Sequence, residues 1–266
     1  MARVAAIQMV SEPEVAPNLA AAARLVAQAA GEGARLVALP EFFCILGRHE
    51  SDKVTVRERD GTGPIQDFLA QTALRNRVWL VGGTVPLECG DPARVRSACL
   101  VYDDSGRRIA RYDKMHLFAY RTGTENYDES RTIEPGAAPL AIESPFGRLG
   151  LSVCYDLRFP ELYRHFERID AWVAPSAFTA TTGAAHWETL LRARAIENLC
   201  YIVAPAQGGL HPNGRRTHGH TMIVDPWGEI VAERAEGEGF VLGEIDSARL
   251  AEVRQSLPAL DNRRLA

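Results

Sequence analysis

Short apolar segments of strand length recur along this chain, and segments with helical spacing separate them. The first two apolar segments are residues 4–9 and 36–43, the second of which is broken by Pro40. Between them, residues 17–31 are rich in alanine, with apolar residues at helical spacing and a glycine at the end. Strand, helix and strand in this order predict α/β layering, with sheets whose strands are largely buried.

The same order of elements occurs twice in the chain. Residues 36–42 resemble 171–178, residues 79–82 resemble 201–204, and residues 100–106 resemble 223–228. Each half therefore reads as strand, helix, strand and β-hairpin. We expect a single domain over residues 1–266, built as two pseudo-symmetric sheets with outer helices. The alternative is a chance similarity between apolar strands.

Charge and hydropathy limit the classes of partner. The 266-residue chain has a net charge of −4 and no polybasic run, so neither nucleic acid nor an anionic membrane is expected as a partner. Its apolar stretches are far shorter than the roughly 20 residues that span a bilayer. The N-terminus leads directly into a strand-like run, without the hydrophobic region of a signal peptide.

The cysteines are odd in number and show no metal-ligand spacing. They are Cys44, Cys89, Cys99, Cys154 and Cys200. No C-x-x-C or Cys/His pattern occurs, so we expect neither a disulfide framework nor a zinc site. The chain is interpreted as a reduced, cytoplasmic protein in which each cysteine either packs in the core or takes part in chemistry.

One of these cysteines is a candidate nucleophile. Residues 147–153 are a mainly apolar run that ends at Cys154, and a polar and aromatic turn then leads to a helix start with Pro160. A buried strand that delivers one small side chain just before a helix is a common way to present a catalytic Cys or Ser. The alternative is a core cysteine, because free cysteines are often buried.

Three charged residues at strand ends or in a loop are candidates for the same site. Glu41 follows an apolar strand and is either a general base or the partner in a structural salt bridge at the strand end. Lys114 follows the first hairpin and is either a solvated strand end or an inward cation that needs a carboxylate. Glu129 lies in the long irregular segment 119–147 and is either a solvated loop charge or a residue lining the site. Strand ends are where α/β sheets gather ligands.

Three ordered motifs carry a resemblance to a known family. They are Leu-Pro-Glu-Phe at 39–42, Asp-Lys-Met-His-Leu-Phe at 113–118 and Leu-Ser-Val-Cys-Tyr-Asp-Leu-Arg-Phe-Pro-Glu at 151–161. With these motifs the chain resembles the carbon–nitrogen hydrolase (nitrilase) superfamily, and the similarity extends over essentially its whole length. The resemblance implies an α-β-β-α sandwich that becomes four-layered on dimerisation.

The resemblance also implies a Glu-Lys-Cys triad and roles for its members. Glu41 is expected to act as general base, Lys114 as the cation near the developing oxyanion and Cys154 as the nucleophile, with Glu129 as a second glutamate. The remaining expected site residues surround the oxyanion and the substrate: Tyr155, Phe178 and Thr179. The backbone N–H of Tyr155 is expected to complete the oxyanion site, and no metal or organic cofactor is required. We expect Asp156, Arg158 and Glu161 to form structural ion pairs that hold the turn.

Within the superfamily, the chain resembles most the branch that contains deaminated glutathione amidase and omega-amidase. The expected reaction is hydrolysis of a small ω-amide of a carboxylic acid through a cysteine thioester, with release of ammonia, as in the deaminated glutathione amidase type. The alternatives are omega-amidase activity on 2-oxoacid amides, and nitrilase or N-carbamoyl hydrolase activity. Ala119 and His218 depart from the pattern expected of this branch, and both lie in or near loops that shape the pocket. The resemblance further implies a homodimer or larger homo-oligomer, with residues 160–168 and the C-terminal tail as candidate contacts. An inactive scaffold homologue is the alternative of another class, and the intact triad argues against it.

Overall fold

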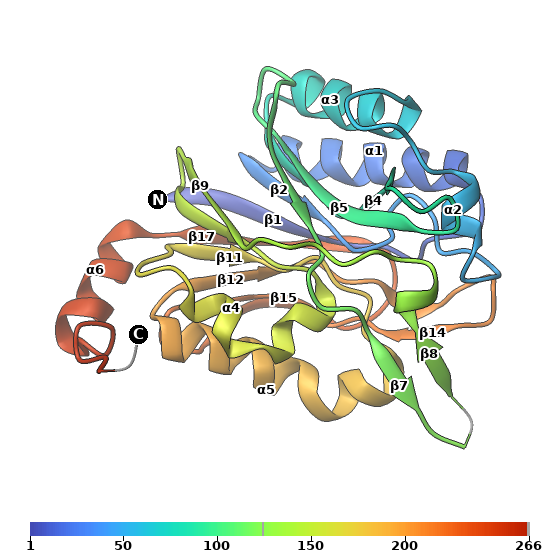
Figure 1. Ribbon diagram of the computed structural model, residues 1–266. Coiled ribbons are helices and arrows are strands. Elements are labelled where there is room, and N and C mark those ends of the chain that lie inside the picture. Colours follow the sequence, from blue (N-terminus) through green and yellow to red (C-terminus); the bar gives the residue numbers. More distant parts are fainter. Residues whose placement is uncertain (124, 265–266) are drawn as a thin grey trace.

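The computed structural model describes residues 1–123 and 125–264. Two β-sheets lie face to face, and helices cover the outer face of each, so the layers follow the order α-β-β-α (Figure 1). Helices α1 (Val15–Gly31) and α3 (Pro64–Asn76) cover the first sheet. Helices α4 (Pro160–Arg164) and α5 (Ala180–Asn198) cover the second. The predicted sandwich is confirmed.

The first sheet brings two strand ends of interest to one edge. Its strand order is β17 (Gly239–Ile245), β1 (Ala2–Gln8), β2 (Leu36–Leu39), β3 (Trp79–Gly82), β5 (Val95–Tyr102) and β4 (Val85–Glu88), with β6 (Arg108–Asp113) also paired to β5. Strands β1, β2 and β3 run parallel, while β5 is antiparallel to both β3 and β6. Strand β6 therefore runs in the same direction as β2, and both strands end at the same edge of the sheet.

The second sheet repeats this topology. Its strand order is β16 (Ile230–Arg234), β15 (Thr221–Val224), β12 (Tyr201–Ala204), β11 (Ala171–Val173), β10 (Gly147–Leu151) and β9 (Leu140–Ser144). Strands β10, β11 and β12 run parallel and β15 is antiparallel to β12, as β1, β2, β3 and β5 are arranged in the first sheet. The outer strands β9 and β17 occupy matching places beside β10 and β1. The similarity between the two halves of the sequence therefore corresponds to a repeat in the structure.

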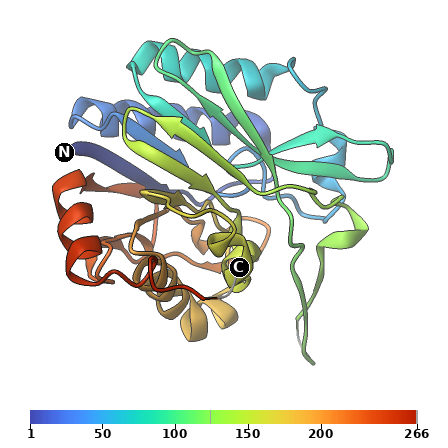
Figure 2. The same ribbon diagram turned by 60° about the vertical axis from the view of Figure 1, so that its left-hand side comes forward.

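The remaining elements lie around the two sheets. They are α2 (Asp52–Thr55), α6 (Ser247–Ser256), two 3-10 turns (Glu129–Arg131 and Cys154–Arg158), the hairpin of β7 (Ala119–Arg121) with β8 (Asn126–Asp128), and the hairpin of β13 (Gly208–Leu210) with β14 (Arg216–His218). Figure 2 shows α6 near the N-terminus, at the end of the sandwich opposite the projecting β7–β8 hairpin. Among the described residues, no helix has the length and apolar character needed to cross a membrane.

Buried side chains alternate between two cores along the strands of the first sheet. In β1, Val4 and Ala6 join the core that includes the inner faces of the sheets, whereas Ala5 and Ile7 join the core beneath α1 and α3. All four side chains are fully buried. Successive strand residues point to opposite faces, so a strand covered on both sides must be apolar throughout. This explains the continuous apolar runs from which the sheets were predicted.

The two sheets are joined at the end of β1. The Gln8 side chain accepts a hydrogen bond from the N–H of Thr221 at 3.0 Å and donates one to the carbonyl of Gly237 at 2.9 Å. The chain then continues along the second sheet, where the Met9 N–H donates to the carbonyl of Ala206 at 3.3 Å. These bonds fix the carboxyl ends of strands from both sheets relative to one another.

Candidate active site

Glu41 lies at the carboxyl end of β2 and is 1% exposed. Its strand leaves the sheet at Pro40, against Gly83, which has a positive φ of 56°. A Cβ atom on Gly83 would lie 2.1 Å from the carbonyl oxygen of Pro40, so only glycine allows this close approach. On the other side, the Gln207 amide donates to the backbone carbonyl of Glu41 at 2.9 Å. The position of the carboxylate is thus set by tight backbone packing.

Lys114 directly follows β6 and is also 1% exposed. Its N–H donates to the carbonyl of Ser97 at 3.0 Å, and its carbonyl accepts from the N–H of Gly136 at 2.8 Å. A Cβ atom on Gly136 would lie 2.1 Å from the carbonyl oxygen of Asp113. Backbone hydrogen bonds on both sides therefore hold Lys114 inward, and the interpretation of Lys114 as a solvated residue at a strand end is excluded.

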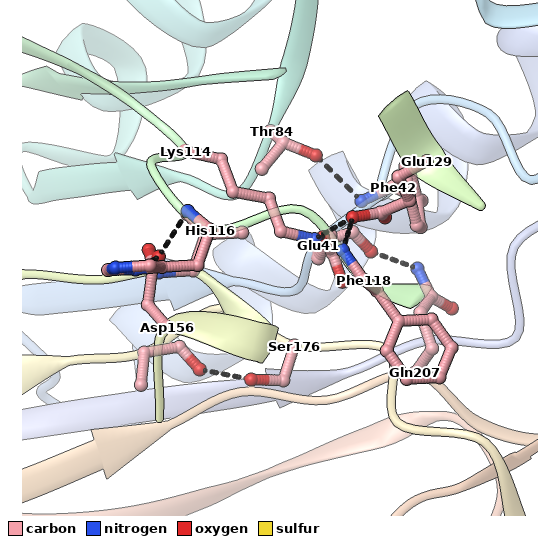
Figure 3. Close-up of polar contacts among 12 residues, drawn as sticks. Glu41, Phe42, Thr84, Lys114, His116, Phe118, Glu129, Asp156, Ser176 and Gln207 are labelled. Carbon is pink, nitrogen blue, oxygen red and sulfur yellow. Dashed lines mark hydrogen bonds and ion pairs between the residues drawn. The ribbon is translucent and has the colours of Figure 1, made fainter. Parts of the chain in front are cut away.

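The ammonium group of Lys114 lies between two carboxylates, as Figure 3 shows. Its Nζ atom is 2.7 Å from Oε1 of Glu41 and 2.7 Å from Oε2 of Glu129. Oε2 of Glu129 also accepts the N–H of Phe118 at 2.7 Å. Glu129 is 7% exposed, so the interpretation as a solvated loop charge is wrong. The irregular segment folds back and supplies the second buried partner of the lysine.

Cys154 begins a 3-10 turn after β10 and is 7% exposed. Strand β10 ends at Leu151, three positions before the point that the apolar run suggested. Cys154 has a φ of 50°, in the left-handed region, which costs a non-glycine residue of order 1–3 kcal/mol. Its N–H donates to the carbonyl of Pro175 at 3.0 Å, which helps to hold the strained conformation. Strain of this kind is common where a nucleophile is presented at a turn.

Electrostatics keep the thiol protonated and the lysine charged. Burial raises the pKa of the Glu41 carboxyl, and the negative charge of Glu129 raises it further. The positive charge of Lys114 and a hydrogen bond with the Cys154 thiol lower this pKa, but the net shift is upward. Burial and the charge of Glu41 raise the pKa of Cys154 well above its usual value, against the opposing effect of Lys114. Burial disfavours the charge on Lys114, but Glu129 and Glu41 outweigh it and raise its pKa well above normal. The resting site therefore holds a neutral thiol beside a basic carboxylate.

Asp156 anchors the turn that carries Cys154, but its partners differ from those expected. It accepts hydrogen bonds from the Val153 N–H at 2.8 Å, the Tyr112 hydroxyl at 2.7 Å and the His116 N–H at 2.9 Å. The predicted ion pairs among Asp156, Arg158 and Glu161 are wrong, since none occurs among the described residues. A fully buried carboxylate at this turn is stabilised by neutral backbone and side-chain donors.

A narrow pocket opens beside Cys154. Its free volume is about 10 Å³, the space of roughly one water molecule. The residues around it are Phe118, Cys154, Tyr155, Arg158, Ala177, Phe178, Thr179 and Thr182. The Arg158 guanidinium lies 5.7 Å from the Tyr155 ring centre and 5.4 Å from that of Phe178. Any larger substrate therefore requires these side chains to move.

The structure places the other predicted site residues as follows. Tyr155 is the second residue of the 3-10 turn, where a backbone N–H has no acceptor within the turn. Phe178 lines the pocket. Thr179 also lines it, but its hydroxyl accepts the N–H of Thr182 at 3.2 Å and caps α5. This cap explains why α5 begins at Ala180.

The two unusual positions differ in their relation to the pocket. Ala119 is exposed at the start of β7, directly after the pocket residue Phe118. The N–H of His218 donates to the carbonyl of Phe178 at 2.9 Å, and its ring stacks on that of His220 with the centres 4.3 Å apart. Burial and the neighbouring His220 lower the pKa of His218 to about 4, so His218 is neutral at physiological pH. His218 thus supports the pocket wall through its backbone.

Gln207 is a site residue to which sequence reasoning gave no role. It is fully buried, and besides Glu41 its amide nitrogen bonds the Ser11 hydroxyl at 2.7 Å. The available signal was a polar residue after an apolar strand and a proline, the pattern that also marks Glu41. Within the described ranges, no group of three or more His, Cys, Asp and Glu side chains is placed to hold a metal ion.

Comparison with known proteins finds similarity to one family over nearly the whole chain. Residues 3–255 match the family model described as carbon-nitrogen hydrolase. The deaminated glutathione amidase of Synechocystis sp. (strain PCC 6803 / GT-S) is 43% identical over 265 residues, covering 97% of each chain. The human deaminated glutathione amidase is 38% identical, covering 98% of this chain and 82% of the human one.

Solved structures agree with the sequence comparison. Saccharomyces cerevisiae Nit3, a member of branch 10 of the nitrilase superfamily, superposes with a TM-score of 0.89 at 31% identity, covering 99% of this chain and 97% of that one. The Caenorhabditis elegans NitFhit protein also gives a TM-score of 0.89, at 35% identity, covering 99% of this chain and 66% of that one. With its fold, its motifs and these relatives taken together, this chain belongs to the carbon–nitrogen hydrolase family of the nitrilase superfamily.

Proposed function

We propose that this chain is an amidase that hydrolyses an ω-amide of a small carboxylic acid through a thioester on Cys154. The observation that carries the proposal is the buried contact of Lys114 with both Glu41 and Glu129 beside a neutral thiol. An amide nitrogen is a poor leaving group, so a thiol nucleophile divides a slow hydrolysis into two easier steps.

In the first step, Glu41 accepts the thiol proton while Sγ of Cys154 attacks the amide carbonyl. A free thiolate would add a negative charge next to two carboxylates that share one lysine, so proton transfer and attack occur together. The new C–S bond gives a tetrahedral oxyanion. Breakage of the C–N bond then transfers the proton from Glu41 to the leaving amine, and a thioester remains on Cys154.

In the second step, Glu41 removes a proton from water, which attacks the thioester. The C–S bond breaks, the acid leaves and the thiol regains its proton. Lys114 and the backbone N–H of Tyr155 stabilise the oxyanion in both steps, an effect worth roughly 3–4 kcal/mol for one donor in other acyl-transfer enzymes. Glu129 holds the Lys114 ammonium group in position through its 2.7 Å contact.

Deaminated glutathione is the substrate that the relatives favour, since the Synechocystis and human proteins carry the name deaminated glutathione amidase. Arg158 lines the pocket beside Cys154, and a guanidinium is well suited to a carboxylate on the acyl chain. Hydrolysis of a panel of ω-amides, including 2-oxoacid amides and deaminated glutathione, tests the proposal, measured as the released amine: ammonia from a primary amide and a dipeptide from deaminated glutathione. Failure to hydrolyse any ω-amide, or full activity in Cys154→Ala, would overturn it.

We further propose that the protein is a cytoplasmic homodimer. All five cysteines are free thiols, which suits a reducing compartment. Around α4 and the C-terminal tail, the Arg263 guanidinium donates to the carbonyl of Arg164 at 3.3 Å, and Arg168 pairs with Asp261 at 2.5 Å. These contacts order the face expected to meet a second copy. Light scattering at micromolar concentration tests this, and a monomer would contradict it.

A further inference from the structure

Arg158 is a cation at the pocket beside Cys154. It is the last residue of the 3-10 turn that begins with Cys154. Its guanidinium carbon lies over the rings of Tyr155 and Phe178, at 5.7 Å and 5.4 Å from their centres. Within the described ranges, no acidic side chain forms an ion pair with Arg158. Its positive charge is therefore available to a ligand that enters the pocket.

His186, in the first half of α5, contacts one end of this guanidinium. Its Nδ1 atom lies 3.3 Å from an Nη atom of Arg158. Arginine can only donate, so Nδ1 is the acceptor and the imidazole carries its proton on Nε2. His186 thus contacts Arg158 in its neutral form. A neutral acceptor orients the guanidinium without cancelling its charge.

The helix presents His186 from a well-anchored turn. The next residue, Trp187, is 1% exposed, and its Nε1 donates to the carbonyl of His220 at 2.8 Å. Its ring also packs against the pocket residue Phe178, with the ring centres 4.8 Å apart. Trp187 therefore ties this turn of α5 to the pocket wall, and the exposed imidazole of His186 lies at a fixed place beside Arg158.

We propose that His186 is a positioning residue, which orients Arg158 to bind a carboxylate on the acyl chain and so sets the preference for acidic acyl groups. The inference rests on the proposed amidase function and names a determinant of its acyl specificity. Cation–π contacts with Tyr155 and Phe178 attract the guanidinium, but a hydrogen bond is more directional. The bond to His186 uses one N–H, and the remaining donors include a parallel pair of the kind that a carboxylate accepts.

The neutrality of the acceptor is the property that a set of replacements can test. In His186→Asn, the amide oxygen takes the place of Nδ1 as a neutral acceptor. His186→Asp has the same shape but adds a negative charge, which would pair with Arg158 and compete with the substrate. His186→Leu removes the acceptor altogether. Because His186 is exposed, none of these replacements should prevent folding.

Two matched substrates report on the acyl end. Glutaramate carries a carboxylate, and 4-nitrobutanamide carries in its place a nitro group, which has a similar shape and no net charge. Both are primary amides, so ammonia release gives kcat and KM for the wild-type protein and each variant. Glu188→Gln is the control, since Glu188 is an exposed residue of α5 that bonds Arg192 at 3.2 Å.

We expect the wild-type kcat/KM to favour glutaramate by about 10- to 100-fold, the usual effect of a hydrogen bond to a charged group. His186→Asn and Glu188→Gln should keep this preference. His186→Leu and His186→Asp should lower it by about 10-fold through a higher KM for glutaramate, because the contact is made equally in the ground state and the transition state.

Several outcomes would overturn the role of His186. They are equal kcat/KM values for the two substrates in the wild-type protein, an unchanged preference in His186→Leu, and the same loss in His186→Asn as in His186→Leu. A fall in kcat that is equal for both substrates in His186→Leu would also overturn it, since that result indicates a general disturbance of the site. If the wild-type protein hydrolyses neither these substrates nor any other ω-amide, the amidase function itself fails.

Discussion

Asp156 and His116 are joined by two hydrogen bonds, one from the His116 backbone N–H at 2.9 Å and one through Nδ1 at 2.7 Å. Asp156 belongs to the turn that begins with Cys154, and His116 lies two residues after Lys114. The His116 ring also stacks on Phe159, with the ring centres 3.7 Å apart. This pair therefore ties the segment that carries the cation to the turn that carries the nucleophile.

Replacement of Asp156 tests whether this tie positions the site. In Asp156→Asn, an amide nitrogen takes the place of an accepting oxygen among several donors, so one buried bond is lost. We expect a loss of about 1–3 kcal/mol in the free energy of unfolding, together with a roughly 10- to 100-fold lower kcat as the site loosens. Urea denaturation and steady-state kinetics measure the two effects. Glu161→Gln, at an exposed residue of α4, is the control, and kinetics matching that control would contradict the prediction.

Removal of the shared cation should be more damaging. Lys114→Met leaves Glu41 and Glu129 buried without the ammonium group that contacts both. We expect kcat/KM to fall by about 10²- to 10³-fold, since the variant lacks an oxyanion donor. Arg131→Met removes a cation that is 69% exposed near Glu129 and should retain activity. Comparable activity in the two variants would show that Lys114 has no catalytic role.

The role of Glu129 can be separated from that of Glu41. Glu129→Gln keeps an oxygen that can accept from the Lys114 ammonium group or the Phe118 N–H, but it removes one negative charge. We expect a lower kcat, by about 10- to 100-fold, with little change in KM, because a positioning residue acts on the transition state more than on ground-state binding. A rise in KM with kcat unchanged would instead indicate direct substrate contact.

The pH dependence follows from the state of Glu41. Burial raises its pKa above the usual 4.5, and the general base must be ionised to accept the thiol proton. As the pH falls, kcat/KM should therefore decrease through a single protonation at a pH above 4.5. The pKa of Cys154 is raised well above 9.0, so no basic limb from the thiol is expected below that pH. A change in kcat/KM below pH 9.0 that is caused by ionisation of the Cys154 thiol would contradict this description.

The sheets were predictable because their strands are apolar on both faces. Residues 36–39 and 201–204 are buried throughout, which gives a continuous signal without the need for periodicity. The strand ends could also be predicted, since Glu41 follows the apolar strand β2 after one proline and Lys114 directly follows the hairpin strand β6. The position of a strand end is a local property of the sequence, and the similarity between the two halves of the chain supported the predicted strand ends.

Other features depend on contacts between distant segments and leave little local signal. Glu129 is buried because a long irregular segment folds back to Lys114, and the sequence around it reads as a solvated loop. Asp156 was expected to pair with its neighbours in sequence, yet Tyr112 and His116 reach it from the first sheet. Within the described residues, the Nε of Arg215 is buried without a hydrogen-bond partner, which depends on the turn between β13 and β14 that composition alone does not place.

The central claim is that catalysis passes through a thioester on Cys154. Intact-protein mass spectrometry after acid quench, within the first turnovers of a good ω-amide substrate, measures this directly. We expect a mass increase equal to the acyl group in the wild-type protein, located on the peptide that contains Cys154, and no increase in Cys154→Ala. Turnover without any such adduct, together with activity in Cys154→Ala, would contradict the mechanism.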